Sequence, residues 1–170
     1  MKTKFLILNA FALTAGLVFS GCSDDNDDLN VDQVPVGVRE TMSQMFPGVY
    51  APEWEQIYPY YVADFMNTGF DTEAWFSADG AWAMTETDYN SNISYLPAAV
   101  QQAFADSQYS QWIVDDVDTY QRTFDSFCVI EVESGISPDV SLFYSYDGIL
   151  LNEVANFDIN ITPNTIVAAL

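Results

Sequence analysis

"WFSADGAWAMTE" at residues 75–86 and "FYSYDGILLNEV" at residues 143–154 each place Asp-Gly between two short runs of alternating apolar residues. Asp-Gly favours a two-residue type I′ turn, because both central residues need a positive φ that Gly adopts freely and Asp tolerates. Each stretch therefore predicts a β-hairpin. The repetition of the pattern predicts two similar structural units in one chain.

Each hairpin is preceded by a stretch that starts with an apolar residue and proline, "VPVGVRETMSQMFP" at 34–47 and "LPAAVQQAFADSQY" at 96–109. Proline at a first helical position, followed by apolar residues four positions apart, predicts a short amphipathic helix. The residues between each helix and its hairpin are rich in Tyr, Val, Ile, Phe and Thr, which predicts strands.

The order of these elements predicts an α+β fold with two tandem units, each a helix followed by three or four antiparallel strands. The first unit is expected at 34–95 and the second at 96–160. A unit of roughly 60 residues buries a modest core by itself, so we expect the two units to pack together. Residues 161–170 again place Pro before apolar residues and form either a terminal helix or a truncated third start.

The ordered pattern of apolar-Pro helix start, Trp and Asp-Gly hairpin, found twice, resembles the PepSY-like family of secreted bacterial proteins. The resemblance covers nearly all of residues 34–154. The tandem units of that family are similar in architecture to beta-lactamase-inhibitor proteins. The resemblance implies helices on one face of an antiparallel sheet, a second face left more open, and no settled activity. The second unit departs from the pattern, because Leu150 stands where the first has Trp82.

The expected register assigns the faces of both hairpins, because alternate residues of a strand share a face. One face of the second hairpin is consistently apolar: Leu142, Tyr144, Tyr146, Ile149 and Leu151. We expect the helix to cover that face. The equivalent face of the first hairpin carries Ala74, Phe76, Ala78, Ala81 and Ala83.

The opposite face of the first hairpin carries Trp75, Trp82 and Met84, with Trp75 paired to Met84 and Trp82 paired to Ser77. Aromatic residues and Met are common anchors at protein interfaces, so these three residues are the candidate binding surface for a protein or peptide. The alternative buries both Trp rings, because the alanines face outward or because a neighbouring strand or terminus covers the rings. Trp54 and Trp112 occupy matching places in the two units and are expected in the core.

The first 21 residues resemble a bacterial lipoprotein signal peptide, with Lys2 and Lys4 before an uncharged apolar run and "FSGC" before the cleavage point. This resemblance predicts lipidation of Cys22, and a plain secretory signal is the alternative. Residues 22–33 are almost without apolar content and predict an acidic, solvated tether. The chain is therefore expected to be an outer-membrane lipoprotein that faces the periplasm or the cell surface.

The composition is strongly acidic, with 4 basic residues against 25 acidic residues and a net charge of −21. Such a surface repels phosphate backbones and anionic headgroups, which argues against nucleic-acid binding and leaves the lipid as the only membrane contact. The 49% of hydrophobic residues is enough for a packed domain.

Catalysis is disfavoured because the chain has no His, and its two Lys residues lie in the signal peptide. Ser-His, Cys-His and Ser-Lys pairs are therefore excluded from the mature chain. Cys128 shares a strand face with apolar residues and predicts a buried, inert thiol. Asp116 and Asp118 share a strand face, but such a pair is expected by chance in so acidic a chain. No catalytic residue, metal ligand or cofactor is predicted.

Three functions remain open. The first is a lipid-anchored, non-catalytic binding or inhibitory module that contacts a protein or peptide through the open sheet face. The second is a structural or accessory envelope lipoprotein without a defined binding site. The third is a carboxylate-based hydrolase, which is the most remote.

Overall fold

The computed structural model of the chain describes residues 29–157 and 160–167. The predicted signal peptide, Cys22 and the first part of the tether lie outside these residues. The described elements are η1 (Val31–Gln33), α1 (Val36–Met45), β1 (Glu53–Ile57), β2 (Tyr60–Asn67), β3 (Phe70–Ser77), β4 (Trp82–Asp88), η2 (Ile93–Tyr95), α2 (Ala98–Ala105), β5 (Ile113–Arg122), β6 (Ser126–Glu133), β7 (Val140–Ser145) and β8 (Leu150–Ala155).

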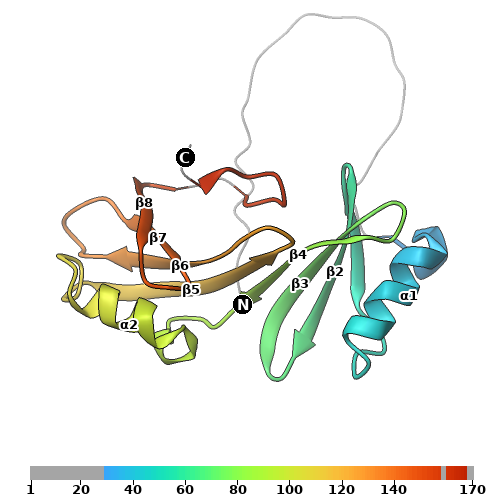
Figure 1. Cartoon of the computed structure of the whole chain (residues 1–170), viewed down its shortest axis with the longest axis horizontal. Helices are drawn as coiled ribbons and strands as arrows, with labels where there is room; N and C mark the ends of the chain where they lie inside the picture. Colours follow the sequence, from blue (N-terminus) through green and yellow to red (C-terminus); the bar gives the residue numbers. More distant parts are fainter. Residues whose placement is uncertain (1–28, 158–159, 168–170) are drawn as a thin grey trace, which may run out of the picture.

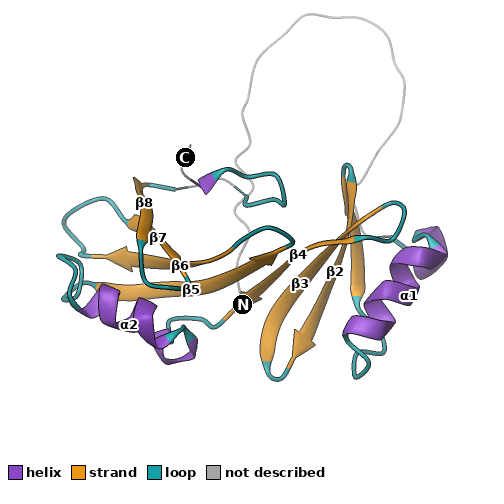
Figure 2. Cartoon of the chain, in the orientation of Figure 1, coloured by secondary structure: helices purple, strands orange, loops and turns teal. Residues whose placement is uncertain are grey.

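All eight strands form one sheet in the order β1 to β8, and each strand pairs antiparallel with its neighbour in sequence. The helix α2 lies in the connection between β4 and β5. Figures 1 and 2 show both helices on one side of the sheet and the C-terminal segment on the other side. The predicted mixed fold with antiparallel strands is confirmed. The two tandem copies remain a prediction. The strands expected in both copies belong to one continuous sheet, so the sheet itself does not divide the chain into two units.

Both helices begin directly after the prolines that predicted them. Pro35 and Pro97 are the N-cap residues, one position earlier than expected. The apolar residues four positions apart are buried as expected: Val38 and Met42 in α1, Val100 and Phe104 in α2. The described residues 160–167 form a turn and no α-helix.

The first Asp-Gly hairpin has a three-residue loop, so the predicted two-residue type I′ turn is wrong. The amide of Gly80 donates to the carbonyl of Ser77 at 2.8 Å. Gly80 has a φ of +88°, whereas Asp79 is not among the positive-φ residues. These features define a type I turn followed by a glycine bulge. The bulge shifts the register by one residue, so Trp82 pairs with Phe76 instead of Ser77.

The second hairpin has the same loop geometry. Gly148 has a φ of +82°, and its amide donates to the carbonyl of Ser145 at 2.9 Å. Leu150 pairs with Tyr144 after an equivalent register shift. In both hairpins the expected faces therefore hold before the turn and change only at the residues next to it, because Met84 still pairs with Trp75 and Asn152 with Phe143.

The tips of both hairpins pack against the first turns of the helices. A β-carbon on Gly80 would lie 2.7 Å from the carbonyl carbon of Gly37 in α1. A β-carbon on Gly148 would lie 2.5 Å from the carbonyl oxygen of Ala99 in α2. The hydroxyl of Thr41 also donates to the carbonyl of Gly80 at 2.8 Å. Glycine is required at both tips for the positive φ and for the close approach.

Each face of the sheet has its own core, because successive side chains point to opposite faces. The helix-covered face packs on α1 through Trp54, Ala63, Phe65, Ala74 and Phe76, and on α2 through Val117, Cys128, Ile130, Leu142 and Tyr144. This confirms the covered face predicted for both hairpins before their turns. It also confirms the burial of Trp54 and Cys128, while Trp112 is half-buried against the α2 core. Ala78 and Ala81, which were expected under the helix, are exposed.

Candidate functional site

The face of the sheet opposite the helices, the helix-free face, changes from acidic to apolar along four neighbouring strands. Alternate residues of a strand share a face. On each of these strands the acidic residue and the first apolar residue of this face are therefore two positions apart. The paired positions are Glu73 and Trp75 on β3, Glu86 and Met84 on β4, Asp118 and Tyr120 on β5, and Glu131 and Val129 on β6. The acidic half consists of Asp64, Asp71, Glu73, Glu86, Asp88, Asp116, Asp118 and Glu131. The apolar half consists of Val62, Trp75, Met84, Tyr120, Phe127, Val129 and Phe143.

The acidic half places carboxylates directly opposite one another on adjacent strands. The like-charged neighbours are Asp64 with Glu73, Glu73 with Glu86, Asp88 with Asp118, and Asp116 with Glu131. Carboxylate oxygens of Asp88, Asp116 and Asp118 lie within 4.8 Å of one another. Like charges in these positions destabilise a sheet. The same arrangement can bind a cation, because carboxylate oxygens accept strong hydrogen bonds from Lys and Arg and are ligands for Ca²⁺.

The acidic half forms the floor of a hollow with a volume of about 710 Å³. Eight of its eleven lining residues are acidic: Asp64, Asp71, Glu73, Glu86, Asp88, Asp115, Asp116 and Glu131. Asn90 and Ser91, from the connection after β4, also line it. The lining contains no basic side chain from the described residues, so its electrostatic potential is negative.

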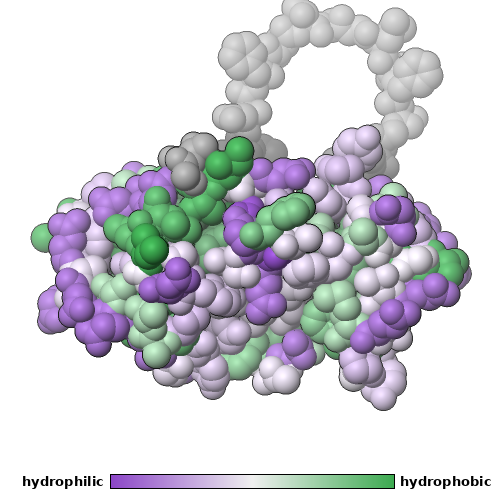
Figure 3. Space-filling model, viewed as in Figure 1, coloured by the Kyte–Doolittle hydropathy of each residue, from purple (hydrophilic) through white to green (hydrophobic). Residues whose placement is uncertain are grey.

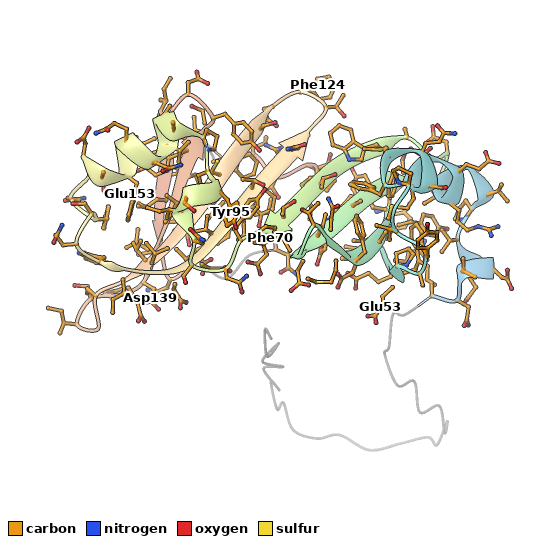
Figure 4. All side chains as sticks on the ribbon, turned by 90° about the horizontal axis from the view of Figure 1, so that it is seen from below. Glu53, Phe70, Tyr95, Phe124, Asp139 and Glu153 are labelled. Carbon is orange, nitrogen blue, oxygen red and sulfur yellow. The ribbon has the colours of Figure 1, made fainter. Side chains whose placement is uncertain are left out.

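Three aromatic side chains pack together where the connection between β4 and β5 begins. The ring of Phe70 lies 4.7 Å from that of Tyr95 and 4.9 Å from that of Tyr89. Figure 4 shows Phe70 and Tyr95 together near the middle of the molecule. Tyr89 directly precedes Asn90 at the edge of the hollow, so this group fixes the position of that edge.

Tyr120 lies at the boundary between the acidic and apolar halves. Its hydroxyl donates to Oε1 of Glu86 at 3.0 Å, and its ring stacks on Phe127 at 4.9 Å. Burial, with the charges of Asp118 and Glu86, raises the pKa of Tyr120 well above its ordinary value. Tyr120 is therefore a neutral hydrogen-bond donor at physiological pH.

The C-terminal segment covers the apolar half. Ile161 and Val167 are both 6% exposed and belong to the same cluster as Trp75 and Met84. Trp75 is 2% exposed and Met84 is 0% exposed. The predicted exposure of Trp75 and Met84 is therefore wrong, because a terminal segment covers them, as the alternative interpretation allowed.

Trp82 lies on the other face of the sheet. The glycine bulge pairs it with Phe76, and it packs on the α1 core, where its indole nitrogen donates to the hydroxyl of Thr85 at 2.9 Å. Only Trp75 and Met84 are brought together as the sequence predicted. The three residues therefore do not form one binding surface.

Cys128 is fully buried in the α2 core, as predicted. Burial raises the pKa of its thiol to about 12. The thiol therefore stays protonated at physiological pH and is a poor nucleophile.

The acidic half was missed by sequence reasoning. Its signal is the spacing of two between acidic residues in "DTE" at 71–73, "ETD" at 86–88 and "DDVD" at 115–118. Of these residues, only Asp116 and Asp118 were predicted from the sequence to share a strand face. The register of β4 with β5 then places Asp88 opposite Asp118, across a connection that contains α2. The pattern of residues within one strand does not determine the register between β4 and β5.

Neither described helix has the length and apolar character needed to cross a membrane. A family model described as "beta-lactamase-inhibitor-like, PepSY-like" matches residues 59–152. No curated protein matches the chain.

Several solved structures are similar to the chain. A BLIP-like protein from Bacteroides fragilis has 38% identity and a TM-score of 0.68, with 76% of this chain and 92% of that chain covered. A DUF2874 family protein from Bacteroides ovatus has 32% identity and a TM-score of 0.66, covering 71% and 86%. A Bacteroides eggerthii protein whose name assigns it to the periplasm has 31% identity and a TM-score of 0.66, covering 72% and 88%.

Proposed function

The chain belongs to the PepSY-like, beta-lactamase-inhibitor-like family, and from this premise we propose that it is a non-catalytic binding module. Its ligand is a cationic segment of a protein or peptide, bound on the acidic half of the helix-free face. The observation that carries the proposal is the register of β2 to β6, which places four pairs of carboxylates opposite one another.

Electrostatics support this choice of ligand. Opposed like charges reduce the stability of the sheet, so their concentration on one face indicates a use beyond folding. A recessed patch of one sign attracts ligands of the other sign and speeds their association. Lys and Arg side chains can reach the carboxylates inside the hollow, because it is open to solvent on the side without helices.

The heptapeptide Lys-Ser-Lys-Ser-Lys-Ser-Lys tests the proposal by isothermal titration calorimetry. We expect it to bind the wild-type chain, with an affinity that falls as salt is added. A Glu73→Gln/Asp88→Asn variant should bind at least several-fold more weakly. A Glu40→Gln/Asp139→Asn variant is the matched control, because it makes the same charge change at exposed positions outside the acidic half.

Three outcomes contradict the proposal. Equal loss of affinity in both variants would mean that net charge alone attracts the peptide. Binding of Ca²⁺ to the wild-type chain without any binding of the peptide would make the acidic half an ion site instead. If neither the peptide nor Ca²⁺ binds the wild-type chain, the structural or accessory role is favoured.

We also propose that the protein is exported and held at the outer membrane by lipid on Cys22. The tether expected at residues 22–33 is shorter than that range, because Leu29 packs on the α1 core and its amide donates to the carbonyl of Trp54 at 2.6 Å. The lipobox-like sequence "FSGC" supports the anchor, and the periplasmic name of the Bacteroides eggerthii relative supports export. Metabolic labelling with a clickable fatty acid tests the anchor. Label that persists in a Cys22→Ala variant would contradict it.

We interpret residues 34–95 and 96–160 as tandem copies of one unit. The interpretation is supported by the repeated order of one α-helix and four strands and by the matching glycine bulges at Gly80 and Gly148. Both bulges also pack on the first turn of a helix in the same way.

A further inference from the structure

The C-terminal segment, residues 161–167, occupies the apolar half through two side chains. Ile161 and Val167 are buried at its ends, while Ile166 between them is 70% exposed. Figure 3 shows hydrophobic residues gathered around this segment and β8. The segment therefore covers the sheet with only part of its own apolar surface.

Within the described residues, side chains of β5 and β8 hydrogen-bond to two backbone carbonyls of the segment. Nη1 of Arg122 donates to the carbonyl of Thr165 at 2.6 Å, and Nδ2 of Asn152 donates to the carbonyl of Val167 at 2.9 Å. The segment belongs to none of the eight strands, and the amide of Thr165 donates to Thr162 within the segment. Segments with few buried contacts and no ladder open more readily than core strands.

The surface under the segment is aromatic. The rings of Tyr120 and Phe127 stack at 4.9 Å, and those of Phe127 and Phe143 lie 6.3 Å apart. The indole nitrogen of Trp75 is buried without a hydrogen-bond partner among the described residues. A buried donor without an acceptor is unfavourable, and a peptide carbonyl would supply that acceptor. Aromatic surfaces with a few polar groups are typical of protein-binding sites.

The apolar half is continuous with the acidic half. Trp75 follows Glu73 by two residues on β3, and the hydroxyl of Tyr120 is bonded to Glu86 across the boundary. One extended ligand can therefore contact both halves. Charge complementarity requires Lys or Arg at one part of that ligand, and the aromatic surface requires large apolar side chains at the other.

We propose that the apolar half is the second part of the ligand site, and that residues 161–167 are a built-in occupant. A partner segment that carries both basic and large apolar side chains displaces them. The inference rests on the proposed function, because the same partner uses the acidic half. Beyond the proposed function, the inference states that the partner also carries large apolar side chains. It also states that residues 161–167 compete with the partner for the apolar half.

The test compares the peptides Lys-Leu-Lys-Leu-Lys-Leu-Lys and Lys-Ser-Lys-Ser-Lys-Ser-Lys on the full chain. An Ile161→Ser/Val167→Ser variant loosens the segment without changing charge. We expect it to bind the Leu peptide about tenfold more tightly than wild type, because a larger fraction of molecules has the apolar half free. The Ser peptide should bind both proteins equally. Ile166→Ser, in the same segment but exposed, is the matched control and should match wild type.

A second readout follows the Trp75 indole proton by NMR with ¹⁵N-labelled Trp, assigned with a Trp75→Phe variant. The Leu peptide should shift this resonance and the Ser peptide should leave it unchanged. Asn152→Ala provides a milder way to loosen the segment if the double variant does not fold. If the loosened variants bind both peptides as wild type does, this inference fails and the proposed function stands. If neither peptide binds wild type, both fail.

Discussion

A β-carbon on Gly148 would lie 2.5 Å from the carbonyl oxygen of Ala99, closer than real β-carbons approach backbone atoms. The contact joins the β7–β8 hairpin to the first turn of α2. Its counterpart in the first half is the contact of Gly80 with Gly37. The two hairpins therefore fix the positions of the two helices on the sheet.

Gly148→Ala should reduce the free energy of unfolding by about 3 kcal/mol, from the strain of a positive φ and from the steric overlap with α2. Gly135→Ala is the matched control. Gly135 has a φ of +73° but nothing within 4 Å of its added β-carbon, so it should lose only about 1 kcal/mol. Urea denaturation measures both. Equal losses would show that the contact with Ala99 is unimportant.

Added salt should stabilise the wild-type chain, because it screens the opposed carboxylates of the acidic half. Glu73 faces acidic residues on both neighbouring strands, Asp64 and Glu86. The gain in melting temperature with NaCl should therefore be smaller in Glu73→Gln than in Glu40→Gln, because Glu40 is an exposed residue of α1 outside the acidic half. A gain of the same size in both variants would argue that the repulsion is spread over the whole surface.

Tyr120→Phe should reduce the free energy of unfolding by about 1–2 kcal/mol, since it removes a hydrogen bond to a carboxylate and leaves Glu86 without that donor. Tyr95→Phe is the comparison, because Tyr95 is 52% exposed and keeps its ring contacts without the hydroxyl. Chemical denaturation measures the free energy of unfolding of both variants, and the loss should be larger in Tyr120→Phe. A stable Tyr120→Phe variant would mean that water replaces the hydroxyl.

Stability should fall as the pH rises from about 9 to about 12, in part because of Cys128. The thiol ionises near its ordinary value of 9.0 in the unfolded chain, but burial raises its pKa to about 12 in the folded state. Unfolding therefore releases a proton in this window, and the unfolded state gains stability with pH. The decline should be less steep in Cys128→Ala. A parallel decline in both proteins would remove Cys128 as a cause.

Thiol chemistry gives an independent measurement. In a Cys22→Ala background, Cys128 should resist a thiol reagent at neutral pH until the chain is unfolded, because the protonated, buried thiol does not react. Rapid reaction of the folded protein would contradict its burial.

Local sequence signals predicted the elements well, but not the face of Trp82 in the first hairpin. Alternation before the turn placed Ala74 and Phe76 under α1 as the structure has them. The turn itself was misassigned, because Asp-Gly also suits a type I turn with a glycine bulge. There Asp79 accepts a hydrogen bond from the hydroxyl of Ser77, which lowers the pKa of Asp79. One extra residue in the loop then moved Trp82 to the other face.

The functional face could not be predicted for a different physical reason. Burial of Trp75 depends on Val167, which is distant in sequence and packs without regular secondary structure. The acidic half depends on the register of Asp88 with Asp118, which is set by the packing of the whole sheet. Periodicity within one strand gives no information about either relationship.

The order of the sheet also has a consequence for how the chain folds. Every ladder between the described strands joins neighbours in sequence, and among these ladders only β4–β5 spans a connection with a helix. Each other pair can form by closing a short loop, and low contact order favours rapid folding. Pairing of β4 with β5 is then the step with the largest loss of chain entropy. That step also completes the surface shared by Met84 and Phe127, so a ligand bound there would stabilise the paired state of β4 and β5.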